Sequence, residues 1–459
     1  MLLKNALIAA ESGTYEGDLR ITGEVFSETG RGLLPVFGEE VIDLTGKIVL
    51  PGGVDVHTHF DLDVGIARAT DDFYTGTVAA ACGGTTTVVD HMAFGPKGCT
   101  IRHQAEAYHK LADGKAVVDY GFHGVLDHVD AAILNELEKL IDEGITSHKF
   151  YLTYAGKISD GEAFALMRKA GELGIILAVH PENDGVVNFL RAELSKSGKT
   201  APIYHARSRP AECEAEAINR MILLAHMAND APLYIVHLTN ALGLGLIKAA
   251  RLRGQENLFA ETCPQYLLLD ESKYLEPDGL KYVMSPPLRE KSDNEALWKG
   301  LQNGDIETIG TDHCPFFYEK EKQLGKDDFT KAPNGAPGVE ARMALMYSYG
   351  VAGGRITLPQ MVQLCSTAPA KLFGLYPKKG VIKLQSDADF VVIDPQKRVA
   401  LTQSLLHENC DYTPYEGLSL SGWPVMTALR GEIIAKDGEF LGEKGRGKFL
   451  KRGLPRLIW

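Results

Sequence analysis

Residues 51–61, PGGVDVHTHFD, are the stretch that decides the fold. An apolar, valine-rich run follows the Pro-Gly-Gly turn and leads into His57 and His59, which predicts a buried β-strand. Because side chains alternate along a strand, residues two apart face the same side. The pattern HxH is common by chance, but it indicates a metal site when partner residues lie elsewhere in the fold.

The same local context recurs along the chain. Each of six polar residues follows a short apolar, β-branched run and precedes polar or turn residues. A side chain at the end of a buried strand can point into a cavity, and four imidazoles, an amine and a carboxylate suit a hydrolytic metal site. These six residues are His57, His59, Lys149, His180, His237 and Asp312.

Strand-like and helix-like segments alternate between about residues 50 and 315. The predicted strands are IVLPGGVDVH, TTTVVDH, VVDYGFHG, ITSHKFYL, IILAVHPE, PLYIVHL, LFAETCPQ and ETIGTDHC. Segments with helical periodicity separate most of them, and several of these helices are expected to stop at Gly144, Gly171 or Gly174. Eight strands with helical crossovers predict an α/β fold, a parallel (β/α)₈ TIM-like barrel whose active site lies at the carboxyl ends of the strands. Those ends carry, in order, His57 and His59, Asp90, His123, Lys149, His180, His237, Thr262 and Asp312.

The two ends of the chain have a different sequence pattern from the predicted barrel. Residues 1–50 and 380–440 contain short strands with turns, and neither end supplies enough strands for a stable sheet. We therefore expect them to pair into one small β-sandwich domain beside a barrel domain of residues 51–379. Residues 441–459 form a basic C-terminal tail, which we interpret as solvated or packed against another subunit.

Composition narrows the choice of partners. The formal net charge is −12, which argues against nucleic acid or an anionic membrane as a partner because both bind basic surfaces. The apolar run at the N-terminus ends at Glu11, too early for a membrane span, so we predict a strand there and a cytoplasmic protein.

Cysteine usage indicates reduced, structural thiols. None of the spacings is CxxC and the count of seven is odd, so a complete disulfide framework is not expected. Cys314 follows Asp312 closely and could be read as a nucleophile, although a metal-activated water would make that role redundant.

Each candidate ligand also has a structural interpretation. His180 or His237 alone could be a hydrogen-bonded core histidine, but at successive strand ends they lie within reach of the HxH pair. Asp312 adds a hard oxygen ligand and a base. A protonated Lys149 cannot coordinate a metal, so it is either a salt-bridged barrel lysine or a lysine that carbon dioxide has converted into a bridging carboxylate. No unassigned Asp or Glu ends a strand nearby, which favours the bridge.

Taken together, the motifs resemble those of a known family. VDVHTHFD, HKFYLTY, AVHPEN, YIVHL, ETCPQYL, MSPPLR, GTDHCPF and PNGAPGVE follow one another as in the cyclic amidohydrolases of the dihydropyrimidinase and D-hydantoinase family. The resemblance spans nearly the whole chain. It is closest to the bacterial phenylhydantoinase branch.

This resemblance implies a dinuclear site and a reaction. Two divalent ions, zinc in the family, would activate a bridging hydroxide that opens the ring of 5-substituted hydantoins or dihydropyrimidines to N-carbamoyl amino acids. Relatives are commonly homotetramers. The implied roles are one metal on His57, His59 and Asp312, the other on His180 and His237, N6-carboxylated Lys149 as the bridge, Asp312 as proton carrier, Tyr154 as oxyanion donor, and Ser285 and Asn334 as substrate contacts.

Two departures bear on the substrate. The related dihydroorotases carry an arginine two residues after the second histidine, whereas this chain has Asp61, which disfavours anionic dihydroorotate. Val64, Ile66 and Ala67 replace a Pro-Phe-Gly-type segment and change the apolar wall for the ring substituent.

Three alternatives stay open. Allantoin hydrolysis is one, and a mononuclear deaminase, which needs no bridging lysine, is another. The third is a non-catalytic scaffold of the same fold that has lost metal ligands; this chain keeps all six ligand positions and Tyr154.

Overall fold

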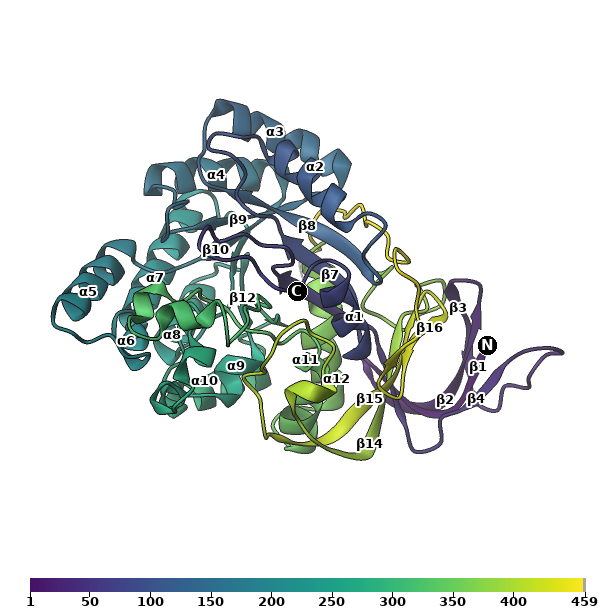
Figure 1. Cartoon of the computed structure of the whole chain (residues 1–459). Coiled ribbons are helices and arrows are strands. Elements are labelled where there is room, and N and C mark those ends of the chain that lie inside the picture. The colour runs from purple at the N-terminus through teal and green to yellow at the C-terminus, as the bar shows by residue number, and fades with distance from the viewer. Residues whose placement is uncertain (457–459) are drawn as a thin grey trace.

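The computed structural model describes residues 1–456 (Figure 1). The strands are β1 (Leu2–Ala10), β2 (Gly13–Thr22), β3 (Val25–Gly30), β4 (Val41–Asp43), β5 (Ile48–Pro51), β6 (Gly53–Thr58), β7 (Thr85–His91), β8 (Asp119–Leu126), β9 (Ser147–Tyr151), β10 (Ile176–His180), β11 (Leu233–Ile235), β12 (Leu258–Thr262), β13 (Thr308–Ile309), β14 (Phe390–Ala400), β15 (Ser419–Leu429), β16 (Glu432–Lys436) and β17 (Glu439–Phe440). The α-helices are α1 (Thr75–Cys82), α2 (Ile101–Ala112), α3 (Ala131–Glu143), α4 (Asp160–Leu173), α5 (Asp184–Lys196), α6 (Ile203–Arg207), α7 (Ala211–Met227), α8 (Ala241–Leu252), α9 (Pro264–Leu268), α10 (Lys291–Asn303), α11 (Arg342–Leu345), α12 (Leu358–Val362) and α13 (Ala368–Leu372). Short 3₁₀ or π segments are η1 (Glu271–Leu275), η2 (Gly279–Tyr282), η3 (Lys322–Gly325), η4 (Phe329–Lys331), η5 (Met346–Ala352), η6 (Gln363–Thr367) and η7 (Gln403–Leu405).

The barrel consists of β6 to β13, paired in parallel in the order of the sequence. A parallel bridge between Thr58 and His313 brings the first and last strands together, and the His59 N–H donates to the His313 carbonyl at 2.9 Å. Helices α2, α3, α4, α7, α8 and α10 lie around the strands (Figure 1). The predicted TIM-like barrel is confirmed, and its closure places the end of β6 beside the segment that carries Asp312.

The stretch IVLPGGVDVH, predicted as one strand, is divided at Gly52 into β5 and β6. A Cβ atom on Gly52 would lie 2.2 Å from Thr86 Oγ1, so only glycine fits this close approach. The Gly52 N–H donates at 3.0 Å to the carbonyl of Asp389, which directly precedes β14 of the other sheet. Strand β6, which carries His57 and ends directly before His59, therefore enters the barrel directly from the second sheet.

The second sheet joins both ends of the chain. Its order is β17-β16-β15-β14-β5-β1-β2-β3, with β4 paired to β1. The antiparallel pairing of β5 with β14 connects residues far apart in sequence. In Figure 1 the purple N-terminal strands and the yellow-green C-terminal strands lie in the same part of the molecule. The predicted pairing of the two termini is confirmed, whereas the domain limits 1–50 plus 380–440, 51–379 and 441–459 stay a prediction.

The helices begin and end mostly where their sequence predicts. The side chain of Asp130 caps α3, and Ser159 forms a reciprocal capping box with Glu162 at the start of α4. Gly144 and Gly174 end these helices in the left-handed conformation. The predicted stop at Gly171 is wrong, because α4 continues to Leu173 and the left-handed turn comes only at Gly174. No helix within residues 1–456 combines the length and apolar character needed to cross a bilayer.

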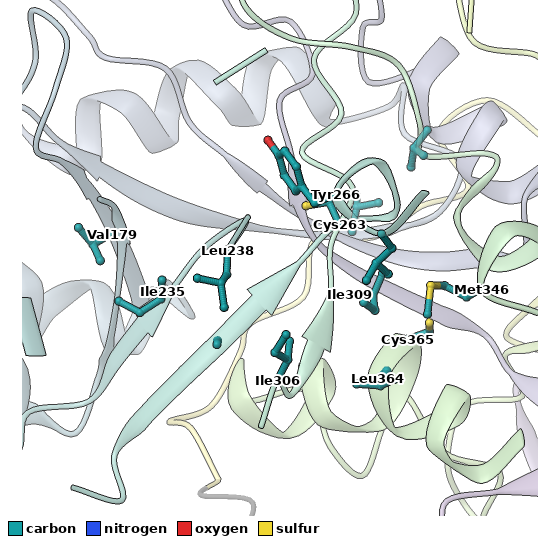
Figure 2. Packing of buried hydrophobic residues seen from close by; sticks show 14 of the residues in the cluster. Val179, Ile235, Leu238, Cys263, Tyr266, Ile306, Ile309, Met346, Leu364 and Cys365 are labelled. Atoms are coloured by element: carbon teal, nitrogen blue, oxygen red, sulfur yellow. The ribbon is translucent and has the colours of Figure 1, made fainter. Parts of the chain in front are cut away.

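A continuous apolar core supports the strand ends. Val179 and Ile235 of neighbouring strands pack in the same cluster as Leu238, and further around the barrel Ile309 belongs to it as well (Figure 2). Met346, Leu364 and Cys365 extend the cluster into the helical segments that follow the barrel (Figure 2). Since these residues are almost fully buried, the backbone beneath the polar strand ends is held rigidly.

The basic tail packs inside its own subunit. The Tyr120 N–H donates to the Lys448 carbonyl at 3.0 Å, and the Leu450 N–H donates to the Tyr120 carbonyl at 2.7 Å. Arg452 is 2% exposed and donates to the Phe122 carbonyl, and burial lowers its pKa to about 9. Backbone pairing with β8 therefore anchors this segment to its own subunit, while the side chains of Lys444, Lys448 and Lys451 stay exposed. Packing of the segment against another subunit stays a prediction. Residues 457–459 of the predicted tail lie outside the described residues.

Candidate metal centre

Four of the six predicted donors lie together, linked through His57 Nε2 and one carboxylate oxygen of Asp312. His57 Nε2 lies 3.0 Å from Asp312 Oδ1, and His59 Nε2 lies 3.1 Å from the same atom. Lys149 Nζ lies 2.9 Å from His57 Nε2. His57, His59 and Asp312 form a group whose ligand atoms all lie within 4.8 Å of one another. The spacing suits ligands that share one divalent cation.

The other two histidines form an adjacent pair. His180 Nδ1 lies 2.9 Å from His237 Nε2. The rings of His57 and His237 stack with centroids 5.5 Å apart, which joins the pair to the first group. The fold thus brings all six predicted donors into one continuous cluster at the carboxyl ends of the strands.

The six donors take different positions along or just beyond their strands. His57 lies within β6, Lys149 lies in the middle of β9 and His180 ends β10. His237 and Asp312 come after β11 and β13, with positive φ angles of 39° and 53°. Left-handed backbone is unusual for residues other than glycine and costs of order 1–3 kcal/mol, so the surrounding structure imposes it. The turn redirects both side chains toward the centre.

The electrostatics of His59, His180, His237 and Asp312 match the protonation states that metal ligands need. Burial lowers the pKa of His59 to about 3 and holds the pKa values of His180 and His237 below the ordinary value, so these imidazoles keep free lone pairs. Burial opposes ionisation of Asp312, but His57 and His59 hold its pKa well below the usual range. Within residues 1–456, Nδ1 of His59 and Nδ1 of His237 are buried without a hydrogen-bond partner. A neutral-imidazole and carboxylate donor set fits divalent cations.

Glu261 of β12 orients His57. Its Oε1 atom lies 2.5 Å from His57 Nδ1 and accepts a hydrogen bond from the His237 N–H at 3.1 Å, while Oε2 accepts from the Tyr234 hydroxyl at 2.9 Å. Burial and Lys149 oppose protonation of His57, yet Glu261 and Asp312 raise its pKa to about 9. The expectation that no unassigned acid lies near the site is wrong. Glu261 contacts Nδ1 of His57, the ring nitrogen that does not face Lys149. Nε2 of His57 therefore points into the cluster.

A second buried carboxylate orients His180. Glu182 Oε2 lies 2.8 Å from His180 Nε2 and also accepts from the Arg209 guanidinium. Burial opposes ionisation of Glu182, but Arg209 and His180 lower its pKa to about 2. A carboxylate that holds one imidazole nitrogen fixes the tautomer and leaves the other nitrogen as a ligand.

Sequence reasoning missed these supporting residues. Glu182 stands two residues after His180, and Glu261 stands in the strand segment LFAETCPQ, so both were accessible as acids at strand ends. Arg209 offered no signal, because only the tertiary fold brings it to Glu182. His91 was also missed; it is 1% exposed and its ring lies 4.6 Å from that of His57.

Replacing Glu261 with glutamine is expected to weaken metal binding about 10- to 100-fold, the usual effect of losing a carboxylate behind a ligand histidine. The amide keeps the size of the side chain but loses the charge that orients His57. Metal content after dialysis against a graded chelator measures the effect. Glu307→Gln is the control, because Glu307 is a buried acid on a different network, accepting from the Ala260 N–H; equal metal retention in both variants would contradict the orienting role.

Other strand-end residues have structural roles. His123 Nδ1 lies 2.6 Å from Ser147 Oγ and its Nε2 lies 3.0 Å from the Val56 carbonyl oxygen. Asp90 accepts from the Thr58 hydroxyl at 2.7 Å and from a backbone N–H, and the Thr262 hydroxyl donates to a carbonyl.

The cysteines fit the structural interpretation. All seven are free, and burial, with Asp312 next, raises the pKa of Cys314 far above the thiol's usual value. An un-ionised thiol is a poor nucleophile, which agrees with the structural interpretation of Cys314.

The predicted substrate residues flank the cluster. The Tyr154 ring lies 5.3 Å from that of His180, and the residue has a positive φ of 72°. Ser285 is 9% exposed and Asn334 is half-buried, on two loops joined by a hydrogen bond from the Gly335 N–H to the Val283 carbonyl at 3.1 Å. Within the described chain, no hydrogen bond links Ser285 or Asn334 directly to the six donors.

A closed parallel barrel with a cluster of buried histidines and an ionised aspartate at its carboxyl rim defines a hydrolase of the amidohydrolase class. The model of the amidohydrolase family matches residues 48–434. A D-phenylhydantoinase of Escherichia coli O17:K52:H18 is 51% identical over 452 residues, covering 98% of each chain. Among solved structures, the dihydropyrimidinase of Brevibacillus agri NCHU1002 has a TM-score of 0.97 at 42% identity, and the D-hydantoinase of Bacillus sp. AR9 has 0.96 at 44%, each covering 99% of both chains.

The chain belongs to the amidohydrolase family and, within it, to the D-hydantoinases and dihydropyrimidinases. It is a cyclic amidohydrolase, as its sequence motifs predict.

Proposed function

We propose that this enzyme hydrolyses the ring amide of 5-substituted hydantoins and dihydropyrimidines, with preference for the D-enantiomer. Water adds to the ring carbonyl carbon, the carbon–nitrogen bond breaks, and the product is an N-carbamoyl amino acid. The observation that carries the proposal is the convergence of His57, His59, Lys149, His180, His237 and Asp312 on one site. The relatives named D-phenylhydantoinase and D-hydantoinase support the substrate class and the enantiomer.

The donor set suits two divalent ions, and we propose zinc. His57, His59 and Asp312 would hold one ion, and His180 and His237 the other. When bound, the ions supply Lewis acidity, which polarises the carbonyl and makes hydroxide available near neutral pH. Nitrogen-rich ligand sets with one carboxylate are typical of zinc.

Lys149 would be carboxylated and shared between the two ions. Burial lowers its pKa to about 8, so more of the amine is neutral near pH 7 than for an exposed lysine. The lone pair of the neutral amine attacks the carbon of dissolved carbon dioxide, the nitrogen loses a proton, and a carbamate forms. This converts a repelled cation into an oxygen ligand beside His57.

Asp312 would carry the proton during ring opening. Its carboxylate is held ionised, so it can accept a proton from the attacking water and deliver it to the leaving ring nitrogen. Its Oδ1 atom lies 3.0 Å from His57 Nε2 and 3.1 Å from His59 Nε2, so both imidazoles hold it at the reaction centre.

Tyr154 would donate to the oxyanion that develops on the carbonyl. Burial raises the pKa of its hydroxyl, so the proton stays in place for donation. Tyr154→Phe is expected to lower kcat about 10²–10³-fold, as for other donors of this kind. KM should change little, because the hydrogen bond strengthens only as charge develops. Steady-state kinetics measures this; a variant in which KM rises and kcat is unchanged would contradict the role. Tyr151→Phe, on the same strand region, is the matched control.

Ser285 and Asn334 would grip the cyclic imide, largely through backbone groups. Ser285 is buried and its hydroxyl interacts with Tyr154, which places it beside the expected oxyanion donor. The loop of Val64, Ile66 and Ala67 would contribute the apolar wall for the ring substituent. Asp61 pairs with Arg68 at 3.1 Å, so its repulsion of an anionic substrate is weakened but not replaced by attraction.

A hydrolysis panel tests the proposed function. Metal-loaded protein is assayed with D- and L-5-phenylhydantoin, dihydrouracil, allantoin and dihydroorotate, and product chirality is determined. We expect turnover of phenylhydantoin and dihydrouracil, with D-product dominant. Turnover of allantoin alone would favour the allantoinase alternative, and no turnover after addition of zinc and bicarbonate would favour the scaffold alternative.

We further propose that the enzyme acts in the cytoplasm as a homotetramer. Exposed apolar side chains on the segment after β3, with Phe37 fully exposed and Leu34 80% exposed, support burial of that segment against another subunit. Light scattering of the purified protein tests the assembly, and a monomer at micromolar concentration would refute it.

A further inference from the structure

Lys322 is a buried cation that anchors two loops. It is 0% exposed and begins η3, and its Nζ donates to the carbonyls of Val283 at 2.7 Å, Pro333 at 2.9 Å and Gly335 at 2.6 Å. An ammonium has three protons, so these three bonds satisfy it completely. Within residues 1–456 it forms no ion pair with a carboxylate, so the three carbonyl dipoles and the Phe316 ring, whose centroid lies 5.9 Å from Nζ, stabilise the charge.

The three carbonyls flank the proposed substrate residues. Val283 lies two residues before Ser285, and Pro333 and Gly335 enclose Asn334. The Gly335 N–H also donates to the Val283 carbonyl at 3.1 Å, so the two loops meet directly at this point. Lys322 therefore fixes the distance between the two backbone segments that would hold opposite edges of a cyclic imide.

The loop that contains Asn334 also packs against the segment that follows Asp312 of the metal centre. The Cys314 N–H donates to the Ala336 carbonyl at 3.0 Å, and His313 forms a parallel bridge with Ala336. A Cβ atom on Gly335 would lie 2.4 Å from the Cys314 carbonyl oxygen, so only glycine allows the loop to pack this closely against the segment after Asp312. Two constraints thus act on the Asn334 loop, one from the segment after Asp312 and one from Lys322.

Burying a lysine without a carboxylate is costly, and an apolar side chain could fill the same space. Burial lowers the pKa of Lys322 to about 7. Core packing alone gives no reason for a lysine here, whereas its amine nitrogen lies within hydrogen-bond distance of carbonyls from both loops.

We propose that Lys322 is a positioning residue for substrate binding, which sets the spacing of the Ser285 and Asn334 loops through their carbonyls. The inference rests on the proposed function, because it takes these two loops as the substrate contacts. Lys322 touches neither the six donors nor the reacting atoms. Its loss should therefore affect substrate binding more than chemistry.

The test compares Lys322→Met with Lys379→Met in the full-length, metal-loaded enzyme. Lys379 is equally buried, but it pairs with Asp119 at 2.6 Å and Asp389 at 2.8 Å near the second sheet. For Lys322→Met we expect KM for phenylhydantoin to rise about 10- to 100-fold, kcat to fall less, and metal content to stay at the wild-type value. For Lys379→Met we expect a lower Tm with unchanged KM.

The outcomes separate the two proposals. Wild-type enzyme that opens no hydantoin or dihydropyrimidine would overturn the proposed function itself. Active wild type, with wild-type KM in Lys322→Met, would overturn only the role of Lys322, as would a loss confined to kcat or metal content. If Lys322→Met does not fold, Lys322→Gln decides, since its amide has only two protons on a shorter side chain and cannot donate to all three carbonyls: a raised KM supports the role and an unchanged KM overturns it.

Discussion

Lys149→Ala is expected to lower kcat by about 10³-fold or more and to reduce bound metal from two ions to one. Without the amine no carbamate can form, so the two groups of ligands lose the anion that they would share. Metal-assisted polarisation contributes several kcal/mol to such reactions, and each 1.4 kcal/mol corresponds to about tenfold in rate. Elemental analysis of the purified protein and steady-state kinetics measure the two effects.

Bicarbonate provides the control for this prediction. Wild-type enzyme stripped of metal and reloaded should recover more activity with added bicarbonate than without it, whereas Lys149→Ala should not respond. Mass spectrometry under non-acidic conditions should show the added carbon dioxide on wild type only. Full activity with two bound metals in Lys149→Ala would refute the bridge and support the interpretation of Lys149 as a structural lysine.

Asp312→Asn is expected to lower kcat about 10²–10⁴-fold, the range for loss of a positioned proton carrier. The amide keeps the volume of the side chain but can neither accept the proton nor provide a full negative charge between His57 and His59. Metal affinity should fall in the same variant, because one anionic ligand is removed. Kinetics with metal in excess separates the two contributions, since the loss of proton transfer persists when the site is saturated.

Asp90→Asn is the matched control for Asp312→Asn. Asp90 is also a buried acid at a strand end, but it accepts hydrogen bonds from Thr58 and the Phe60 N–H, and burial raises its pKa well above the usual value. A neutral carboxyl replaced by an amide changes no charge, so we expect near wild-type metal content and a small effect on kcat. Comparable losses in both variants would contradict a special role for Asp312.

Much of the fold could be predicted because its signals are local. Apolar runs that alternate with helical periodicity indicated the barrel, and the polar residue at the end of each run indicated the site. The wrong details have local causes too. Gly171 allowed α4 to continue, because a glycine ends a helix only where the chain adopts the left-handed turn. The division at Gly52 depends on contact with Thr86, which strand patterns do not reveal.

The supporting residues of the site could not be predicted with the same certainty. Glu261 contacts His57 across 204 residues of sequence, and Lys322 reaches carbonyls in two other segments. These contacts depend on strand register and loop packing, to which every residue of the core contributes. The left-handed backbone at His237 and Asp312 likewise follows from the turn that the barrel imposes.

By itself, the sequence determined the chemical types of the donors, their order along the chain and their placement at the ends of strands, because side-chain chemistry and strand periodicity are local properties. Only the tertiary structure decided which nitrogen of each histidine faces the site, which carboxylates hold the other nitrogen, and where the basic tail and the buried Lys322 dock. These features depend on contacts between residues far apart in the sequence. Such contacts form only when the chain folds and barrel closure brings β6 beside the segment of Asp312.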